Sequence, residues 1–294
     1  MFTYQNSSRY IWVDGKIISL EQANFHVMNH SLHYGNAVFE GERSYYGNVF
    51  AMEDHHKRLL RSAEILGYHI PYTIEELNKA AKDIIYVNDL TDYDDVYLRL
   101  IAWKGGISLG ISAPSLPIHL SFIAMRWPTY RHQKRNPLRL GWTKWVRPPP
   151  NSFPHEAKAA GQYIISSLCR EDVFKEGYDD AVMMDYRGYV AECPGANIFM
   201  IKNKVLYTPI ADCFLNGITR QTVLKIASEN IGLECKETVI TKEDIESADE
   251  IFVTGSAVEV FPVQEISGKM FSCGKISKDI IYSYLKLVGA NIIE

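Results

Sequence analysis

The residues of this sequence that are best suited to chemistry are a lysine, a carboxylate and the glycine-led start of a helix. Lys158 lies among small residues in the segment Glu-Ala-Lys-Ala-Ala-Gly-Gln-Tyr at 156–163. Small neighbours let a flat ligand approach the backbone. Apolar crowding at a helix entry favours the neutral form of a lysine amine, which can attack a carbonyl carbon. Most lysines are solvated surface charges, so this interpretation depends on the groups that later segments of the chain supply.

Two later segments supply the other groups. Glu192 stands before a Pro-Gly turn and an apolar strand, and a carboxylate buried at a strand end needs a cationic partner. The segment Leu-Asn-Gly-Ile-Thr-Arg at 215–220 leads into a helix predicted for 221–231, whose free N–H groups and threonine hydroxyl suit an anion. The small residues at 255–257 could offer further N–H groups to a phosphate. An amine, a carboxylate and a phosphate cradle are together what pyridoxal phosphate requires of a protein.

Four motifs in this order make the sequence resemble a known family. They are Lys-Ala-Ala-Gly-Gln-Tyr (158–163), Glu-x-x-x-x-Asn-Ile-Phe (192–199), Leu-Asn-Gly-Ile-Thr-Arg (215–220) and Thr-Gly-Ser-Ala-Val-Glu-Val (254–260). The chain resembles the class IV, or fold type IV, pyridoxal-phosphate aminotransferases, and within them most of all the branched-chain amino acid aminotransferases. The resemblance covers nearly the whole chain. It implies an α+β fold with a small N-terminal α/β domain and a larger C-terminal domain that is β-barrel-like with helices.

The resemblance also implies roles for single residues. Lys158 would bind the cofactor covalently and carry the proton between the substrate α-carbon and the cofactor. Glu192 would pair with the pyridine nitrogen, and Tyr163 would donate a hydrogen bond to the phenolate oxygen. The phosphate would be held by Arg58, in a segment similar to the family's His-x-x-Arg-Leu, and by Ile218, Thr219 and Ser256, while Asn197, Leu215 and Gly217 would complete the cofactor site.

Substrate binding is expected from the first half of the chain. Arg99 lies in a predicted strand between apolar residues, where a buried cation needs a partner. From the residues alone, a structural salt bridge and a clamp for a substrate carboxylate are both open. The resemblance implies branched-chain L-amino acids (leucine, isoleucine and valine) as donors and 2-oxoglutarate as acceptor. The expected contacts are Tyr34, Phe39, Trp127 and Tyr130 for the apolar side chain, Arg99 and Tyr97 for the carboxylate, and Ser256 and Ala257 beside them.

Departures from the family's pattern bear on substrate preference more than on cofactor use. The family usually has Gly-x-Gly-Glu before Asn197, where this chain has Cys-Pro-Gly-Ala at 193–196, and usually has threonine at the place of Ser256. D-amino acid aminotransferase, an alternative of the same fold, carries an Arg-x-His carboxylate trap that this sequence lacks, and aminodeoxychorismate lyase is a weaker alternative. A non-catalytic protein that binds pyridoxal phosphate is the alternative from another class. It would have no need of Lys158 together with Glu192.

Length and composition are those of a soluble globular enzyme. The chain has 294 residues, of which 47% are hydrophobic and 22% charged. This length predicts two domains, a small N-terminal domain at 1–130 and a large cofactor-binding domain at 139–294, joined by a linker at 131–138. A net charge of −4 predicts no binding to nucleic acid or membranes, and the basic run near the linker is too short to change that.

Cysteine usage and the chain start indicate a cytoplasmic protein. The five cysteines are odd in number and form no CxxC motif, which is typical of reduced thiols. The segment before Tyr10 lacks the features of a signal peptide, and no apolar run reaches 18 residues. The partners expected from the resemblance are amino acids, 2-oxo acids and further copies of the chain in a homodimer or larger homo-oligomer.

Local patterns predict several elements. Hairpins are expected around Asp14-Gly15 and Gly47-Asn48, helices over about 53–65, 73–87 and 277–288, and strands over 95–103, 117–127 and 138–146. The spacing of His26, His30 and His33 would allow metal binding. Because Asn29, Ser31 and Gly35 favour a turn and no acidic or thiol ligand stands nearby, we interpret these histidines as turn and packing residues and expect no metal.

Overall fold

The computed structural model describes residues 9–292, and the chain folds into two compact units. Unit 1 contains the chain up to Pro128 together with Ala157–Gly161, and unit 2 contains Thr129–Glu156 and the chain from Gln162 onward. The first eight residues, on which the expectation of no signal peptide depends, lie outside the described part. Within that part, every helix is too short or too polar to cross a membrane.

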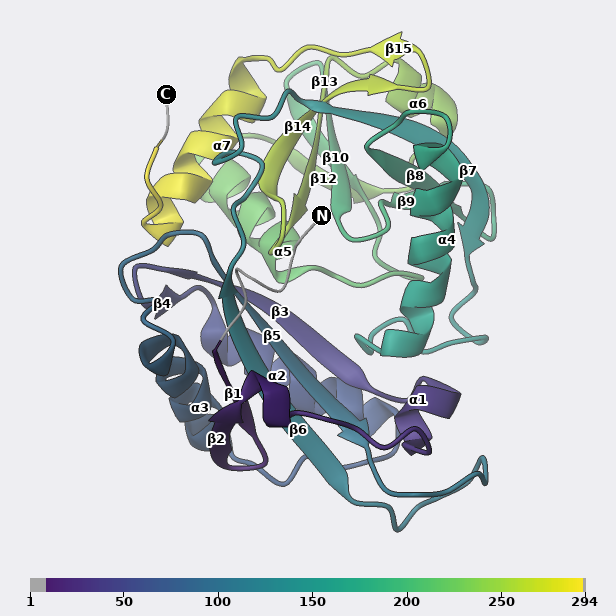
Figure 1. Cartoon of the computed structure of the whole chain (residues 1–294). Coiled ribbons are helices and arrows are strands. Elements are labelled where there is room, and N and C mark those ends of the chain that lie inside the picture. Colours follow the sequence, from purple (N-terminus) through teal and green to yellow (C-terminus); the bar gives the residue numbers. More distant parts are fainter. Residues whose placement is uncertain (1–8, 293–294) are drawn as a thin grey trace. The chain divides into compact units, whose positions relative to one another are not determined.

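Unit 1 is built on an antiparallel sheet in the order β2-β1-β6-β5-β3-β4 (Figure 1). Its strands are β1 Tyr10–Val13, β2 Lys16–Ser19, β3 Val38–Tyr45, β4 Asn48–Val49, β5 Val96–Lys104 and β6 Ile118–Arg126. The first predicted hairpin is confirmed, since Asp14 and Gly15 adopt the left-handed conformation that a two-residue turn needs (φ 48° and 86°). The second hairpin turns at Tyr46 and Gly47, one residue earlier than predicted, because Asn48 already pairs in β4.

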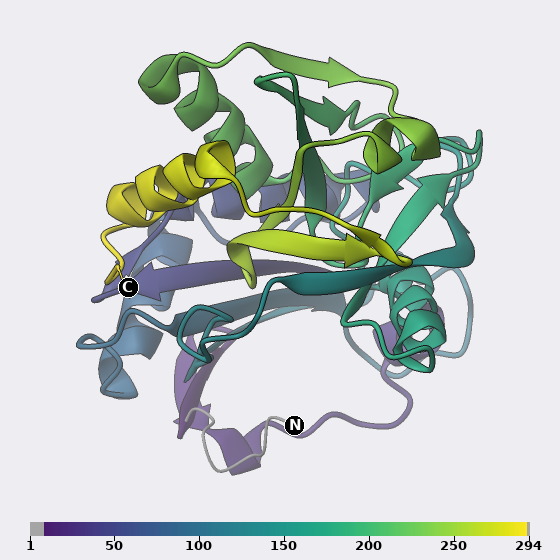
Figure 2. The same ribbon diagram turned by 90° about the horizontal axis from the view of Figure 1, so that it is seen from above.

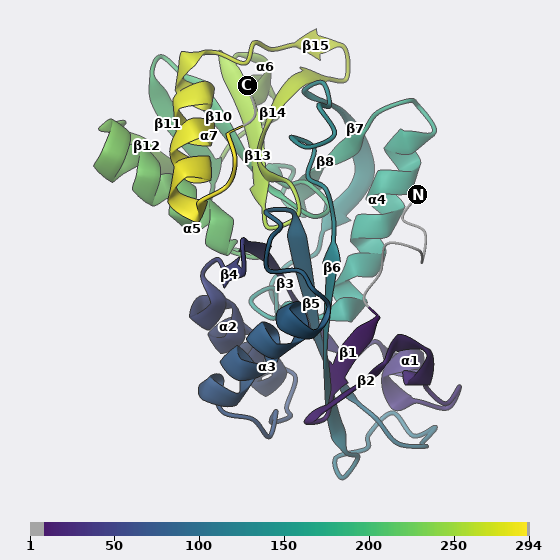
Figure 3. The ribbon, with the colours of Figure 1, turned by 60° about the vertical axis from the view of Figure 1, so that its left-hand side comes forward.

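Two long helices lie on one face of the unit 1 sheet. The helical segments are the 3-10 turn Leu20–Gln22, α1 His30–Tyr34, α2 Met52–Ile65 and α3 Ile74–Val87. Helix α2 packs on β3, and α3 packs beside α2 on β1 and β6 (Figure 3). The predicted capping box is present, because the Glu76 N–H donates to the Thr73 hydroxyl and the Thr73 N–H donates to the Glu76 carboxylate.

Unit 2 is built on a mixed sheet whose main path is β12-β11-β10-β13-β14-β7-β8-β9, with β15 paired to β14. Its strands are β7 Leu138–Arg147, β8 Asp180–Asp185, β9 Val190–Glu192, β10 Asn197–Lys202, β11 Val205–Pro209, β12 Cys235–Thr238, β13 Glu250–Gly255, β14 Glu259–Ile266 and β15 Lys269–Met270. Strand β7 pairs in parallel with both β8 and β14, and β9 at one end of the path also contacts β10 and β11. This mixed, curled sheet agrees with the predicted α+β class and barrel-like second domain.

Helices cover the unit 2 sheet. They are the 3-10 turn Ala160–Gln162, α4 Tyr163–Phe174, α5 Ile218–Lys225 with a π-helical continuation Ile226–Ile231, α6 Lys242–Glu246 and α7 Lys275–Val288. The yellow α7 packs beside the green α5 and its continuation (Figure 2). The helix predicted to begin at Gln221 begins three residues earlier, at Ile218, because Gly217 already serves as its N-cap. Apolar side chains from β7, β10, β13 and β14 form the core of the unit.

The segment around Lys158 packs with unit 1, although the predicted domain ranges place it in the C-terminal domain. The Phe39 N–H donates to the Lys158 carbonyl at 3.0 Å, and the Ala160 N–H donates to the Ala37 carbonyl at 2.8 Å. Gly161 allows this approach, since a Cβ there would lie 3.1 Å from the Gly35 carbonyl oxygen. Small residues therefore let the lysine segment come close enough to form backbone hydrogen bonds with the start of β3.

The change from unit 1 to unit 2 falls at Pro128 and Thr129, slightly before the predicted linker at 131–138. That linker is packed into unit 2. The Tyr130 ring lies edge-on to Phe261, and Arg135 forms an ion pair with Asp179 at 3.0 Å. Polar composition suggested a linker here, whereas long-range contacts give the segment a fixed place in unit 2.

Candidate active site

Lys158 is fixed through its backbone and leaves its amine beside an aromatic ring. Its N–H donates to the Ser62 hydroxyl at 3.0 Å, while its neighbours Ala157 and Ala159 are buried. The side chain is partly exposed, and Nζ lies 5.1 Å from the centre of the Phe39 ring. A rigid backbone and a partly exposed amine are what an attacking lysine requires.

The Phe39 ring also receives the guanidinium group of Arg99. Strands β3 and β5 pair with Phe39 opposite Ile101 and Gly41 opposite Arg99, which brings these side chains to one face of the sheet. The Arg99 guanidinium carbon lies 4.6 Å from the centre of the Phe39 ring, and Nη2 donates to the Tyr97 hydroxyl at 3.1 Å. Gly41 makes room for that hydroxyl, since a Cβ at this position would collide with it.

Arg99 has no ion pair with an acidic residue of the described chain, 9–292, and its buried Nε has no hydrogen-bond partner there. The structural salt bridge that the sequence left open is therefore not found. A partly buried cation held only by a hydroxyl and two rings is costly unless an anion joins it. The geometry favours the other interpretation, a clamp for a carboxylate.

The aromatic side chains that were predicted to contact the substrate lie in different parts of the fold. Trp127 lies beside Tyr97, with ring centres 4.8 Å apart, so both belong to the Phe39 and Arg99 group. Tyr34, on α1, is 40% exposed and donates to the Leu109 carbonyl at 2.5 Å. Tyr130 belongs to unit 2, where it lines a cavity of about 330 Å³.

Arg58, the predicted phosphate ligand, is held by a buried carboxylate that the sequence did not single out. Its Nε and Nη2 donate to the two oxygens of Glu40 at 2.6 and 2.8 Å, and His55 Nδ1 lies 2.7 Å from the same carboxylate. Burial by itself raises the pKa of Glu40, but the charges of Arg58 and His55 outweigh it and lower the pKa well below its usual range. Glu40 therefore stays ionised and fixes the direction of Arg58 from the face of β3 that packs on α2.

In unit 2, the predicted acid Glu192 has the cationic partner that its place at a strand end requires. Arg147 Nη2 lies 2.7 Å from Glu192 Oε1, and both side chains are 8% exposed. Asn197 Nδ2 donates to Glu192 Oε2 at 3.2 Å and to the Leu215 carbonyl at 3.1 Å. The sequence offered one signal for Arg147, a cation directly after the strand predicted over 138–146, but nothing in it paired this cation with Glu192.

Asn197 also links the acid to the start of α5. Its Oδ1 occupies the space that a Cβ at residue 217 would need, so any larger residue than glycine would displace the Asn197 amide. As the N-cap residue, Gly217 has no side chain with which to cap the helix. The first N–H groups of α5, at Ile218 and the buried Thr219, therefore lie at a helix end without an N-cap side chain, which suits an anion.

The other cofactor residues predicted in unit 2 lie in a turn after β13 and at the start of α4. Ser256 and Ala257 form the turn that follows β13, two and three residues after Thr254, which pairs with Asn197. Tyr163 is the first residue of α4 and is half-buried. Unit 2 thus brings together the acid and the helix start, and unit 1 brings together Lys158 with the Phe39 and Arg99 group. Each set by itself suits a part of pyridoxal phosphate, since an acid and a helix start suit a ring nitrogen and a phosphate, and a lysine amine suits an aldehyde.

Three histidines and one acidic cluster of the described chain have partners within the protein. His30 Nε2 bonds the Gly110 carbonyl, His33 Nε2 bonds the Val27 carbonyl and His26 Nδ1 accepts from Met28, as expected of turn and packing residues. In unit 2 the side chains of Asp185, Asp212 and Cys213 lie within 4.8 Å of one another. Arg187 forms ion pairs with both aspartates, so it balances one of their two negative charges.

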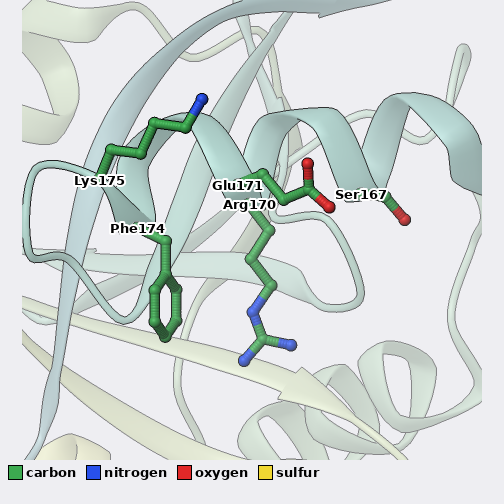
Figure 4. A pocket seen from close by; sticks show the side chains of 5 residues that line it. All are labelled: Ser167, Arg170, Glu171, Phe174 and Lys175. Carbon is green, nitrogen blue, oxygen red and sulfur yellow. The ribbon is translucent and has the colours of Figure 1, made fainter.

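A surface hollow of about 550 Å³ lies on α4, away from the predicted site residues. It is lined by Ser167, Arg170, Glu171, Phe174 and Lys175, along the outer side of the helix and its end (Figure 4). Its lining comes from one face of a helix and its end, and carries charges of both signs.

Comparison with known proteins agrees with this geometry. The family model of class IV amino-transferases matches residues 37–266. A probable branched-chain-amino-acid aminotransferase of Rickettsia bellii is 40% identical over 288 residues, which cover 97% of this chain and 98% of that protein.

Solved structures are similar as well. The branched-chain aminotransferase of Thermoproteus uzoniensis with norvaline superposes with a TM-score of 0.91 at 36% identity, covering 96% of this chain and 95% of the other. The branched-chain amino acid aminotransferase of Thermobaculum terrenum in its PLP-bound holo-form has a TM-score of 0.88 at 28% identity, covering 97% and 95%. A match of this length and identity, on a chain whose lysine, acid and helix start are placed as described, means that the protein belongs to the class IV aminotransferases.

Proposed function

We propose that this protein transfers the amino group of branched-chain L-amino acids (leucine, isoleucine and valine) to 2-oxoglutarate, with pyridoxal 5′-phosphate as cofactor. The observation that carries the proposal is the placement of the Lys158 amine and the Arg99 guanidinium over one ring, that of Phe39. An α-amino acid with an apolar side chain presents a reacting α-carbon, a carboxylate and a hydrocarbon group. The three residues are complementary to these three features.

The cofactor, when bound, supplies the electron sink for the α-carbon and carries the amino group between the two substrates. Lys158 Nζ takes the proton from the substrate α-carbon and returns it at the cofactor. Glu192 would hold the pyridine nitrogen and keep it protonated, and the Tyr163 hydroxyl would donate to the phenolate oxygen. Arg58, Ser256 and the N–H groups of Ile218 and Thr219 would hold the phosphate, with Asn197, Leu215 and Gly217 beside them.

The substrate contacts follow from the unit 1 cluster. Arg99, oriented by the Tyr97 hydroxyl, binds a carboxylate, and the rings of Phe39 and Trp127 pack on the branched side chain. The other residues proposed to line the substrate pocket are Tyr34, Tyr130, Ser256 and Ala257. One pocket that accepts both leucine and 2-oxoglutarate needs such a combination of apolar rings and a cation without a fixed carboxylate.

Amino transfer with alternative substrates tests the assignment. The purified protein, loaded with pyridoxal phosphate, is assayed with L-leucine, L-isoleucine, L-valine or D-alanine, each with 2-oxoglutarate. We expect turnover of the three L-amino acids and little of D-alanine, and abolished turnover in Lys158→Ala. A preference for D-alanine would assign the protein to the D-amino acid aminotransferases, and the absence of any turnover with cofactor bound would assign it to the non-catalytic binders.

We also propose that the protein is a homodimer. An apolar surface of unit 1, which we call the "loop surface", supports this. It is made by two segments that are joined by hydrogen bonds. Its exposed side chains are Phe25, Val27, Leu32, Tyr34, Ile107, Leu109 and Ile111. Bonds from Tyr34 to the Leu109 carbonyl and from His30 to the Gly110 carbonyl fix the two segments together. Such a preorganised apolar surface is typical of an interface, and sedimentation should find the dimer.

Location and domain roles complete the proposal. We propose a cytoplasmic location because all five cysteines are free thiols, which a reducing compartment preserves; cell fractionation tests it. We also propose that the first unit acts as the small substrate-binding domain and the second as the large domain that holds the cofactor ring and phosphate. Limited proteolysis of the protein with and without pyridoxal phosphate should then protect sites in the second unit first.

A further inference from the structure

Arg147 forms the central contact of the buried polar network in unit 2. It is the last residue of β7, and Glu192 is the last residue of β9, on the far side of β8. Its Nη2 lies 2.7 Å from Glu192 Oε1 and 3.2 Å from the Ser166 hydroxyl of α4. Arg147 is therefore held from a helix as well as from a strand, so that its position does not depend on a ligand.

Two cysteine thiols lie in the electrostatic surroundings of Glu192. Burial raises the pKa of the Cys193 thiol well above its usual value and that of Cys213 to about 12, so both thiols are uncharged at pH 7. Asp180, the first residue of β8, also acts on the Cys193 thiol, and as an acid it adds no positive charge here. Arginine keeps its proton throughout the accessible pH range. Arg147 thus supplies a permanent positive charge next to a buried acid.

The two oxygens of Glu192 have different partners. Oε1 faces Arg147, whereas Oε2 accepts from the amide of Asn197, which also bonds the Leu215 carbonyl. Both neighbours are buried, so the plane of the carboxylate is set by groups of the protein. Such an arrangement preorganises an acceptor for a cationic N–H.

We infer that Arg147 is a positioning residue for the cofactor, which keeps Glu192 ionised and oriented so that a protonated pyridine ring binds without any exchange of protons. This inference rests on the proposed function. Without Arg147, the buried acid would take up a proton, because burial without a cation disfavours the charged form. A protonated acid and a protonated ring cannot share one hydrogen bond, so one proton must leave when the cofactor binds.

The consequence is a pH dependence that the wild-type protein lacks. In Arg147→Met, the affinity of the apoprotein for pyridoxal phosphate falls relative to wild type as the pH is lowered, by up to about tenfold per pH unit while the acid is protonated. Calorimetric titration in two buffers of different ionisation enthalpy counts the protons released. We expect about one more proton released per cofactor bound by Arg147→Met than by wild type at pH 6.

Matched variants separate this effect from a general loss of structure. Arg139→Met removes another arginine of β7 that pairs with a glutamate, Glu265, but at an exposed position, and it should leave both readouts unchanged. Arg147→Lys keeps a cation and should restore binding without proton release. In a Glu192→Gln background, Arg147→Met should add no further pH dependence, because the group through which it acts is gone.

The outcomes distinguish this inference from the proposed function. If wild-type apoprotein does not bind pyridoxal phosphate, the proposed function fails. If it binds, and Arg147→Met weakens binding equally at all pH values or by the same amount in the Glu192→Gln background, Arg147 acts only on structure and the inference is overturned. Should Arg147→Met fail to fold, Ser166→Ala loosens Arg147 from its second contact and must then show the same pH trend in a weaker form.

Discussion

At the scale of single residues, the surroundings of an arginine decide what it can bind. Arg58 gives two of its nitrogens to the buried Glu40, so its charge is largely balanced inside unit 1. Arg99 meets only a hydroxyl and aromatic rings among the described residues. The Arg58 guanidinium group is thus held in one direction by a carboxylate, whereas the Arg99 guanidinium group is placed to bind the anion of a ligand.

Arg99 should therefore control carboxylate binding. We expect Arg99→Met to lower kcat/KM for L-leucine and for 2-oxoglutarate roughly 30- to 1000-fold, because a charge-assisted contact in a partly buried site is lost. This corresponds to a loss of about 2–4 kcal/mol of transition-state stabilisation. Steady-state kinetics measure this. Arg61→Met, an exposed arginine of α2, serves as the control and should change little. Unaltered kinetics in Arg99→Met would show that the carboxylate binds elsewhere.

Glu40 should contribute stability that depends on pH. Its pKa is lowered in the folded state, so its contribution is complete above the pKa of the unfolded chain, near 4.5, and decreases as the pH falls below that value. Glu40→Gln should lower the free energy of unfolding at pH 7 by about 3–5 kcal/mol, since it leaves the largely buried guanidinium group of Arg58 without its carboxylate partner. Urea unfolding at pH 7 and pH 4 tests this.

The control for Glu40 is Glu64→Gln. Glu64 forms an exposed pair with Arg61 on α2, and such pairs contribute about 0–1 kcal/mol. A loss in Glu40→Gln as small as in this control, or a loss that does not shrink on acidification, would contradict the expectation.

At the scale of elements, short turns and strand ends place the reactive groups. Helix α5 begins at Gly217 because Asn197, the first residue of β10, fills the space beside it. Gly217→Ala would push the Asn197 amide away from both Glu192 and Leu215. We expect the affinity of the apoprotein for pyridoxal phosphate to fall at least about tenfold, which corresponds to the loss of one or two hydrogen bonds to a charged ligand. Equilibrium dialysis measures it.

The matched control for Gly217 lies in the same loop region. A Cβ at Gly195 would meet no atom within 4 Å, and its φ is not in the left-handed region, so Gly195→Ala should bind the cofactor as wild type does. Equal losses in the two variants would mean that any change near the turn disturbs the site, and that the close approach to Asn197 has no special part.

The start of β8 carries a charge that costs stability. Burial raises the pKa of Asp180 from 3.8 to about 6, against the opposing effect of Arg170. The folded chain thus holds a proton there up to about pH 6, whereas the unfolded chain releases it near pH 4, so stability falls as the pH rises through this range. Asp180→Asn should raise the free energy of unfolding by about 1–3 kcal/mol at pH 7.5 and leave it unchanged at about pH 3.5. Thermal unfolding at the two values tests the sign.

The control for Asp180 is Asp279→Asn on α7, an exposed residue that pairs with Lys275. Its removal should change stability by less than about 1 kcal/mol at either pH. A destabilised Asp180→Asn at the higher pH would show that the hydrogen bond from the Ala181 N–H to this carboxylate outweighs the cost of burying its charge.

At the scale of the whole molecule, the loop surface of unit 1 bears on assembly. If this surface forms the dimer interface, Ile111→Glu should shift the protein toward monomers, because a buried charge opposes association. Light scattering after gel filtration measures the mass. Tyr86→Glu, a change at an exposed apolar residue of α3 outside the surface, should leave the dimer intact. A dimer that persists in Ile111→Glu would place the interface elsewhere.

The sequence by itself determined features that depend on neighbours along the chain. The Asp14-Gly15 turn, the capping box at Thr73 and the glycine before α5 are local, because backbone conformation and helix capping involve residues only a few positions apart. The family motifs are equally short, so they identified the lysine, the acid and the helix start before any fold was known.

Only the tertiary structure decided which distant residues meet. The packing of Lys158 along β3, the pairing of Arg147 with Glu192 and the clamp of Glu40 on Arg58 each depend on strand order and on which face a side chain takes. A sequence shows that a buried charge needs a partner, but many cations could serve. The strand order β7-β8-β9 brings Arg147 to Glu192, and the alternation of side chains along β3 turns Glu40 toward Arg58. Ion pairs require atoms within about 4 Å, and only the folded chain sets that distance.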